Sequence, residues 1–337
     1  MIAIHHRKGS FSDKWIEYCE VHNVPYKIVD CYSNNIIEQV RDCKAFMWNW
    51  GHSDFIAKKF VLQLTHSLEM IGIVVFPNIK TGWHYDDKLG QKYLLEAINA
   101  PSIPTHIFYN KSKAIRWAKT ENFPKVFKTR NGAGAMNVKL IKNSKEAINI
   151  IKRSFGKGIP SYNKVSKIKD KWWKFKRDRT ILSLMRVVKH ILKSILPLRY
   201  VAQYSVERNY AYFQDFIPNS KFDYRMKVIG NRCWGFRRNV RENDFRASGS
   251  GLVNYDPDLI PEQLIKLSFD IAKKLKLQSV AFDFIEHKGS FKIIELSYSF
   301  GMTDGQTELG YWDSDLKWKP GKFNPEYWMI EDVLEKV

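Results

Sequence analysis

The chain has 337 residues, of which 44% are hydrophobic and 14% aromatic, and it carries a formal net charge of +20 at pH 7. This composition excludes a disordered chain and can build a large core over two or three domains or subdomains. The positive charge predicts a polyanionic partner, such as nucleotide phosphates, an acidic polysaccharide, an anionic membrane or nucleic acid. No stretch approaches the ~20 uninterrupted apolar residues of a membrane span, and the first residues lack a signal peptide's apolar segment, so we expect a cytoplasmic protein.

The first part of the chain alternates short β-prone runs with helical patterns. The runs lie at residues 1–5, 26–29, 45–48 and 71–76, and the helical patterns include 13–22 and 54–70. Such alternation is typical of a parallel sheet with helices on its faces. We therefore predict a small parallel α/β domain over residues 1–83.

The middle of the chain, residues 84–207, is predicted to form a second segment. It opens with a helix at about 86–98 and contains a hairpin around Lys128. A basic insertion, residues 157–199, interrupts this segment, and about a dozen Lys and Arg stand there against two Asp. Within the insertion, residues 180–196 have helical periodicity.

The helix predicted at 180–196 is strongly amphipathic. Its basic face carries Arg186, Lys189, His190 and Lys193, and its apolar face carries Leu184, Met185, Val187, Val188, Ile191, Leu192, Ile195 and Leu196. Such a helix fits the surface of an anionic membrane, with residues 172–197 as the contact segment. The alternatives are that the apolar face packs on the protein's own core, or that the basic face contacts nucleic acid.

The last segment, residues 208–337, changes to adjacent strands. Strands are predicted at 210–216, 223–229, 232–239, 279–286 and 291–296, with one long helix at about 261–275. This order indicates an antiparallel sheet accompanied by a helix. The predicted fold class is therefore α/β, with α+β character in the second half.

A β-prone run that ends at Lys128 leads into a turn containing Gly132 and Gly134. Glycine has no Cβ, so the backbone N–H groups of such a turn can approach phosphate oxygens while the lysine supplies a positive charge. The pattern predicts a nucleotide phosphate site. A solvated hairpin is the alternative.

Two carboxylates, Asp283 and Glu295, stand in apolar strands joined by a turn at 288–289. An unpaired carboxylate in such surroundings is costly, so a ligand is expected. On neighbouring strands the two side chains could point to the same face and hold one or two Mg²⁺ ions, which prefer oxygen ligands. The alternative is a pair of carboxylates at strand ends in solvent.

Two further segments carry candidate binding groups. Residues 243–251 combine Arg246, Ser248 and Ser250 with two glycines, a composition suited to holding an oxyanion, although a flexible surface loop is the alternative. Residues 214–218 form an extended segment whose backbone can meet an adenine edge.

Together and in this order, these segments resemble the ATP-grasp superfamily of carboxylate–amine ligases over about residues 80 to 300. The resemblance is closest to the ribosomal-protein glutamate ligase and D-alanine ligase branches. It implies an ATP-grasp fold preceded by a small parallel α/β domain. It also implies ATP and Mg²⁺ as cofactors, with two ions expected.

The resemblance implies a role for each matched residue. In the predicted nucleotide site, Lys88 and Lys128 bind the phosphates, and the loop with Gly132 and Gly134 closes over them. The adenine is bound by Gln214, Asp215, Phe216 and Ile217. The ribose is contacted by Asp223. The predicted metal ligands are Asp283 and Glu295, followed by Ser297, which stands in place of the family's usual Asn. The third ligand is the Ser297 hydroxyl or a water, unless the site has only two protein ligands. The predicted catalytic groups are Arg246 with Ser248 and Ser250 on the acylphosphate, and Arg225 or Arg237 on the acceptor carboxylate.

The implied reaction is amide formation through an acylphosphate. The basic charge favours an acidic acceptor, and we expect an amino acid or other amine to be attached to a uronic-acid polysaccharide of the cell envelope. A peptide or protein ligase acting on a soluble acceptor is the alternative enzyme, and a non-catalytic basic protein that holds membrane or nucleic acid is the third hypothesis. Under the favoured hypothesis the partners are ATP, the acidic glycan or peptide, the amine and the inner face of an anionic membrane, and nucleic acid is not expected.

Overall fold

The computed structural model describes residues 1–132, 137–160, 168, 171–173, 175–176, 179–195, 206–241, 245, 247, 249–302 and 305–337. The chain forms two compact units. The first unit comprises Met1–Tyr85, Gly90–Ser102 and Asn219–Val337. The second unit comprises Asp86–Leu89 and Ile103–Pro218.

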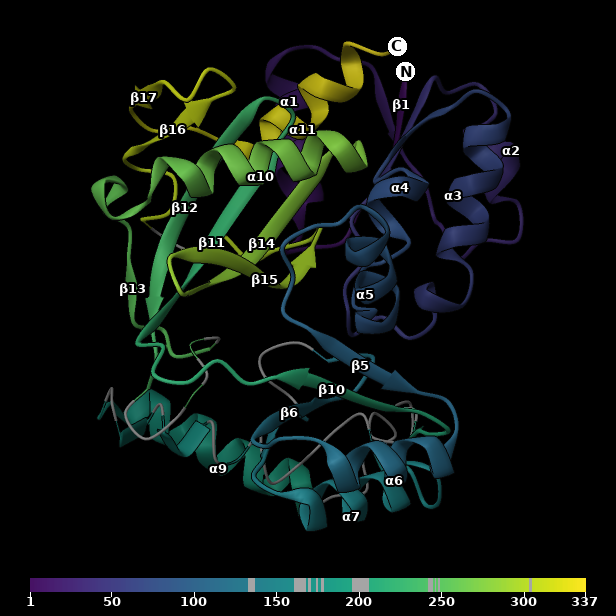
Figure 1. The fold of residues 1–337 in the computed structure, drawn as a ribbon. Helices are drawn as coiled ribbons and strands as arrows, with labels where there is room; N and C mark the ends of the chain where they lie inside the picture. Colours follow the sequence, from purple (N-terminus) through teal and green to yellow (C-terminus); the bar gives the residue numbers. More distant parts are fainter. Residues whose placement is uncertain are drawn as a thin grey trace. The chain divides into compact units, whose positions relative to one another are not determined.

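The beginning of the first unit is a four-stranded parallel sheet in the order β2-β1-β3-β4 (Figure 1). Its strands are β1 (Ile2–His5), β2 (Tyr26–Ile28), β3 (Ala45–Trp48) and β4 (Val74–Phe76). Its helices are α1 (Phe11–Val21), α2 (Ile36–Val40), η1 (Ala57–Lys59), α3 (Val61–Met70) and α4 (Ile79–Gly82). Every residue of β3 is buried, as expected for a parallel strand covered on both faces. The predicted parallel α/β arrangement of this segment is confirmed.

A larger sheet of the first unit runs in the order β15-β14-β11-β12-β16-β17, with β13 paired to β12. All these pairs are antiparallel, as predicted for the second half. The strands are β11 (Phe222–Ile229), β12 (Arg232–Asn239), β13 (Val253–Asn254), β14 (Ser279–His287), β15 (Ser290–Ser297), β16 (Gly310–Asp313) and β17 (Trp318–Pro320). The helices here are α5 (Lys88–Ala97), which begins in the second unit, η3 (Pro257–Leu259), α10 (Glu262–Leu275) and α11 (Pro325–Leu334).

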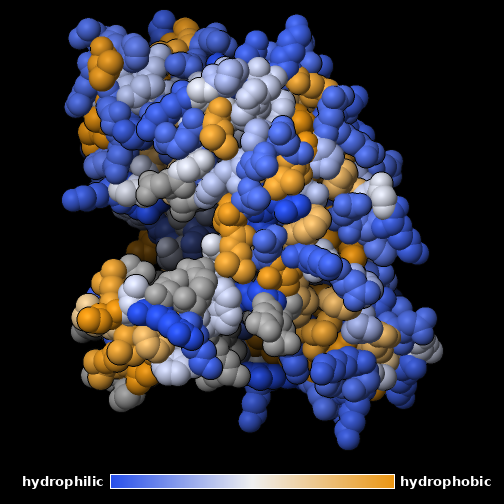
Figure 2. All heavy atoms as spheres, turned by 90° about the vertical axis from the view of Figure 1, so that its left-hand side faces the viewer, coloured by the Kyte–Doolittle hydropathy of each residue, from blue (hydrophilic) through white to orange (hydrophobic). Residues whose placement is uncertain are grey.

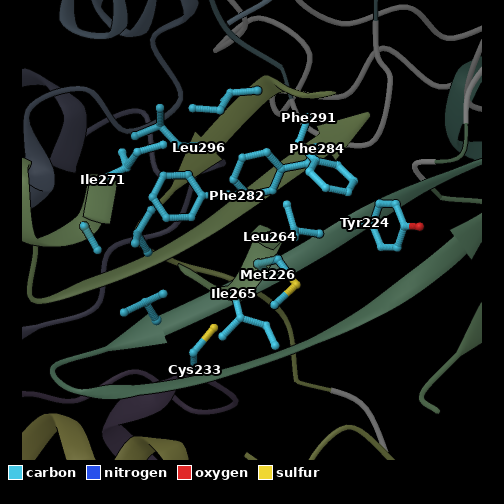
Figure 3. Packing of buried hydrophobic residues seen from close by; sticks show 14 of the residues in the cluster. Tyr224, Met226, Cys233, Leu264, Ile265, Ile271, Phe282, Phe284, Phe291 and Leu296 are labelled. Carbon is cyan, nitrogen blue, oxygen red and sulfur yellow. The ribbon is translucent and has the colours of Figure 1, made fainter. Parts of the chain in front are cut away.

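One face of the larger sheet packs against α10 and is apolar (Figure 3). Alternate side chains of β11 and β14 point to this face, among them Met226 and Phe282, and they meet Leu264 of α10. All three of these side chains are fully buried. Because successive side chains of a strand alternate between faces, the residues between them face the other side.

The two sheets of the first unit share a hydrophobic cluster. Ile4 and Trp15 of the N-terminal part pack in one core with Trp234, Phe300 and Trp328. Residues 1–83, predicted as a separate domain, therefore lie in one compact unit with 219–337.

The second unit contains an antiparallel sheet in the order β5-β10-β6-β7. Its strands are β5 (Thr105–Phe108), β6 (Lys125–Lys128), β7 (Lys139–Ile141) and β10 (Ala211–Asp215), and a separate pair joins β8 (Ile159–Pro160) to β9 (Val206–Glu207). Its helices are α6 (Lys111–Thr120), α7 (Ser144–Ser154) and α9 (Ile181–Ile195). Strand β10, assigned by the sequence to the 208–337 segment, thus pairs within the second unit. The three-segment division itself stays a prediction about domains.

None of the described helices is long and apolar enough to cross a membrane.

Candidate active site

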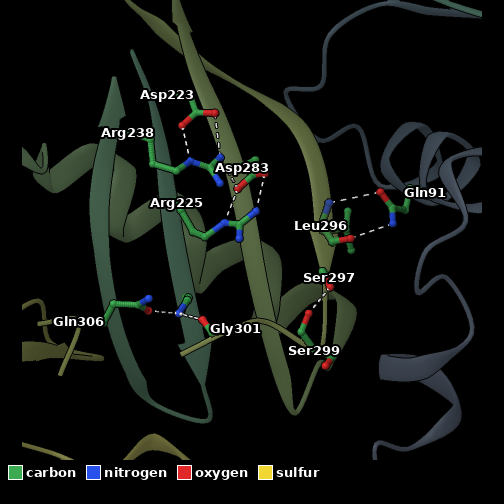
Figure 4. A network of polar contacts seen from close by, with 11 residues as sticks. Gln91, Asp223, Arg225, Arg238, Asp283, Leu296, Ser297, Ser299, Gly301 and Gln306 are labelled. Carbon is green, nitrogen blue, oxygen red and sulfur yellow. Dashed lines mark hydrogen bonds and ion pairs between the residues drawn. The ribbon is translucent and has the colours of Figure 1, made fainter. Parts of the chain in front are cut away.

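The face of the larger sheet opposite α10 is polar along three neighbouring strands. The register places Asp223 of β11 beside Arg238 of β12, and Arg225 of β11 beside Asp283 of β14. Directly paired residues point to the same face of a sheet. These four side chains therefore meet on one face (Figure 4).

The four side chains form one ion-pair network in which all but the half-buried Arg225 are buried. Arg225 donates to both Asp283 oxygens at 2.7 Å, through Nε and Nη2. Arg238 donates to the two Asp223 oxygens at 2.7 and 2.8 Å, and its Nη2 lies 2.9 Å from Asp283 Oδ1. The planar guanidinium matches a carboxylate bidentately, so the geometry of each pair is well defined.

The network controls the charge of Asp283. Burial alone would raise the pKa of this carboxyl group, but the guanidinium groups of Arg225 and Arg238 outweigh it and hold the pKa of Asp283 below its ordinary value. Asp283 is thus an anion that two cations keep in a fixed orientation.

The second predicted carboxylate, Glu295 of β15, is paired in register with Asp283. The register shifts by one residue between Asp283 and Phe284, a bulge that locally re-aims the strand next to this pair. A buried amide fixes the following residue: Gln91 of α5 donates to the Leu296 carbonyl at 2.8 Å and accepts from its N–H at 3.3 Å. The structure therefore brings together the two carboxylates predicted to hold Mg²⁺.

The third predicted metal ligand, Ser297, closes β15. Its hydroxyl donates to the carbonyl of Ser299 at 2.5 Å. Among the described residues, no group of three or more His, Cys, Asp or Glu side chains is arranged to hold a metal ion. The oxygen donors of Asp283, Glu295 and Ser297 fit a hard cation chemically, although the two guanidinium groups on Asp283 weaken its attraction for one.

The sequence reasoning missed Arg238 and chose its neighbour Arg237. Residue 237 is paired with Tyr224, so it lies on the opposite face from Arg238. There its guanidinium carbon lies 4.5 Å from the ring centre of Phe222, a cation–π contact. Pairing the residues of the two strands outward from the hairpin turn would have placed Arg238 opposite Asp223, on the same face.

The predicted oxyanion loop is described only in part. Arg246 and Ser248 lie outside the described residues. Ser250 is fully buried, and its backbone N–H donates to the Ala247 carbonyl at 3.0 Å. The assignment of this loop to an oxyanion stays a prediction.

In the second unit, both predicted phosphate lysines are buried. Lys128 ends β6 and donates to the side-chain oxygen of Gln214, on β10, at 2.6 Å. Lys88 donates to the Gly132 carbonyl at 3.0 Å, and the Gly132 N–H donates to Asp86 at 2.8 Å. Gly132 has a φ of 134°, which glycine accommodates most readily. Lys88 is thus hydrogen-bonded to the turn that follows Lys128. Gly134 lies outside the described residues.

The predicted adenine segment continues from β10. The carboxylate of Asp215 accepts from Lys125 at 2.7 Å and contacts His106 at 3.1 Å, so this side chain is engaged in ion pairs. Phe216 and Ile217 follow it and are half-buried. Their contact with adenine stays a prediction.

Comparison with known proteins decides the fold. No protein-family model and no curated protein sequence matches the chain. A RimK-domain ATP-grasp protein from Sphaerobacter thermophilus is similar in structure, with a TM-score of 0.54, 14% identity, and 88% of this chain and 89% of that chain covered. D-Alanine–D-alanine ligase from Bacillus anthracis has a TM-score of 0.54 and 14% identity over 99% of this chain and 96% of that chain.

This chain has the ATP-grasp fold. The ATP-grasp fold that the motifs implied and the mixed α/β class are confirmed. A third ATP-grasp comparison is the biotin carboxylase domain of 2-oxoglutarate carboxylase from Hydrogenobacter thermophilus, solved with MgADP, ADP and bicarbonate. Its TM-score is 0.57 at 13% identity, with 99% of this chain and 69% of that chain covered. At such identities the similarity establishes the ATP-grasp fold alone, because one fold hosts many activities.

Proposed function

We propose that this chain is an ATP-dependent ligase that activates a carboxylate as an acylphosphate and joins it to an amine. The observation that carries the proposal is the polar face of the larger sheet, where Asp283 and Glu295 are paired in register beside two oriented arginines. Carboxylates on an otherwise well-packed sheet cost stability, so they indicate a functional site.

The proposed nucleotide and metal ligands are residues that the sequence predicted for these roles. Lys88 and Lys128 bind the ATP phosphates, and Gln214 with the segment that follows it binds adenine. Glu295 is the main Mg²⁺ ligand, with Asp283 and Ser297 as further oxygen donors. Bound Mg²⁺ would neutralise charge on the phosphates during transfer.

The proposed chemistry needs positioning and charge neutralisation rather than a protein nucleophile. An oxygen of the substrate carboxylate attacks the γ-phosphorus of ATP, and ADP leaves. The amine nitrogen then attacks the acyl carbon, phosphate leaves, and the nitrogen loses a proton. Arg225, with Arg238 in place of Arg237, and the loop with Arg246 and Ser248 would stabilise the negative charge of these steps.

The proposed acceptor is an acidic polymer, because the chain carries a net charge of +20. We favour a uronic-acid polysaccharide of the cell envelope. A peptide acceptor in solution is the second candidate.

The decisive experiment measures ADP and phosphate release from MgATP with pools of amines and of uronic acids, acidic glycans or acidic peptides. Release should require both an amine and a carboxylate, and Asp283→Asn should abolish it. Asp270→Asn is the matched control, because Asp270 is an exposed aspartate of α10 paired with Lys266. Failure of the wild-type protein to bind MgATP would exclude the ligase.

We further propose that α9 lies on an anionic membrane surface. Of its apolar side chains, Val187 is buried, whereas Met185, Val188 and Leu192 are 54%, 48% and 56% exposed. Most of the predicted apolar face is therefore not packed in the core of the second unit. Figure 2 looks at the side on which Figure 1 draws α9, and apolar atoms gather in the lower part of that view.

Charge favours a lipid surface over an apolar protein partner. Lys176, Arg179 and Lys189 are exposed in the described part of the basic insertion, next to the apolar side chains of α9. Basic groups beside exposed apolar ones are the composition that anionic membrane surfaces attract. This proposal would bring the enzyme to a membrane-linked acceptor.

Vesicle flotation tests the membrane proposal. The protein should float with phosphatidylglycerol vesicles and not with phosphatidylcholine vesicles. The triple change Met185→Ser, Val188→Ser and Leu192→Ser should weaken partitioning about 100-fold, because each buried side chain contributes about 1 kcal/mol. The control, Met70→Ser with Ile71→Ser, alters apolar side chains of the first unit that are even more exposed. Equal flotation of the two variants, or none of the wild type, would refute the proposal.

A further inference from the structure

A lysine is completely buried beside the proposed active site. Lys227 of β11 is 0% exposed, and it lies two residues from Arg225, on the same face of the strand. Its Nζ atom lies 4.5, 5.4 and 5.6 Å from the ring centres of Phe300, Trp234 and Phe236. An aromatic cage therefore surrounds the amine.

The amine is bound to one short segment of the chain. Nζ donates to the Gly301 carbonyl at 3.2 Å and to the side-chain oxygen of Gln306 (Figure 4). It also lies 3.6 Å from the Met302 sulfur. Phe300 of the cage belongs to the same segment. No carboxylate in the described part of the chain lies within ion-pair distance of this amine.

Burial of this ammonium group opposes folding, because no described carboxylate lies within ion-pair distance and the charges of Glu326 and Asp283 act on it only from further away. Burial, aided by the nearby Arg225, lowers the pKa of Lys227 well below its ordinary value. An uncharged side chain of similar length, such as methionine, would suit the cage better. A residue that opposes folding at an otherwise apolar position is expected where function requires it.

A second buried lysine shows the ordinary arrangement. Lys125 of β6 is 7% exposed, and its Nζ lies 2.7 Å from Asp215 and 3.1 Å from Glu121. Its charge is compensated by two carboxylates. Lys227 has neutral acceptors instead, and all of them lie in the segment 301–306.

That segment continues from β15, which ends with the proposed metal ligands. Only two residues separate Ser297 from Phe300, and the Ser297 hydroxyl already donates to Ser299. A restraint at Gly301 and Gln306 therefore limits how far the end of β15 can move.

We propose that Lys227 is a positioning residue that anchors residues 300–302 and Gln306 to β11 and thereby holds Glu295 and Ser297 in place, at a cost in folding stability. The catalytic part of this inference rests on the proposed ligase function. The anchoring part does not.

Lys227→Met tests both parts, because methionine keeps the length and apolar contacts but removes the donors. We expect its urea unfolding midpoint to equal or exceed that of the wild type. Amide hydrogen exchange over 299–307 should be at least about fivefold faster, because a local restraint is lost. In the ligase assay, kcat should fall about tenfold or more while KM for ATP changes little, because the proposed phosphate lysines belong to the second unit.

Two matched variants sharpen the test. Lys125→Met should lower the unfolding midpoint, because it leaves two carboxylates without their partner. Gln306→Met should speed exchange over the same segment while leaving Lys227 intact. Unchanged exchange in Lys227→Met, or a loss of stability as large as in Lys125→Met, would overturn the anchor. If the wild-type protein releases no phosphate, the ligase proposal fails, and the exchange and stability results still decide the anchor.

Discussion

The two faces of the larger sheet differ in their charged groups, although the same strands build both. Toward α10, β11 presents Tyr224 and Met226, which are packed in an apolar cluster. Toward the other side it presents Asp223, Arg225 and Lys227. The comparison teaches that one strand can pack its core face against a helix and present functional side chains on the other face, since neighbouring residues never share a face.

The polar face is nevertheless sensitive to truncation. Arg238→Met leaves Asp223 with neither of its bidentate bonds and removes one cation from Asp283. We expect a loss of about 3–5 kcal/mol in the free energy of unfolding, because removal of one partner leaves a buried charge unpaired. Urea unfolding measures this loss. The control is Lys266→Met, which breaks the exposed Lys266–Asp270 pair, and its free energy of unfolding should stay within about 0.5 kcal/mol of the wild-type value. A small effect in Arg238→Met would show that water reaches this network.

The apolar face should respond through stability alone. Met226→Ala removes a fully buried side chain and should cost about 2–4 kcal/mol in the free energy of unfolding. Below the unfolding transition the ligase kcat should stay within about twofold of the wild type, because the side chain points away from the polar face. A large loss of kcat in the folded variant would contradict the division of labour between the faces.

A substitution that alters only a proposed metal ligand should lower the activity and leave the stability nearly unchanged. Glu295→Gln keeps the size of a half-buried side chain and removes its charge. We expect kcat/KM for the ligase reaction to fall about 100-fold or more, and the free energy of unfolding to change by less than about 1 kcal/mol. Steady-state phosphate release and urea unfolding of the same preparation decide it, and full activity in the variant would remove Glu295 from the site.

The smallest expected effect is the loss of folding stability at low pH that follows from protonation of Asp283. The pKa of Asp283 is lower in the folded protein than in the unfolded chain, so its contribution to stability is complete above the unfolded value near 4 and is lost as the pH falls below it. Between pH 5 and pH 3, Asp283 should account for about 1 kcal/mol of lost stability. Unfolding curves at both pH values should show a smaller acid loss in Asp283→Asn than in the wild type, and equal losses would contradict the ion pairing.

Much of this architecture could be read from local patterns. Alternating β-prone and helical runs predicted the parallel sheet, and the succession of adjacent strand segments after residue 208 predicted the antiparallel sheet. The motif order from Lys88 to Glu295 predicted the ATP-grasp fold. The pairing of Asp283 with Glu295 was predicted because a short turn joins their strands, which makes the contact nearly local.

The structure alone decided the contacts that join distant segments. Arg238 rather than Arg237 meets Asp223 because the register of β11 and β12 sets which face each residue takes. The cage of Lys227 includes Phe300, which is far along the chain. The sequence around Lys227 does not predict this contact. The exposure of Met185 and Leu192 likewise depends on what packs against α9.

The sequence by itself therefore determined the order of the elements and their amphipathic faces, because these follow from short-range periodicity and turn chemistry. The ATP-grasp fold was predicted from the resemblance of its ordered motifs to that family. The tertiary structure decided which charges pair, that Lys227 is buried among aromatic rings, and which apolar side chains of α9 are left exposed. Those outcomes depend on register and on packing between residues far apart in the chain, and a hydrophobic pattern records that a side chain is apolar but not what will cover it.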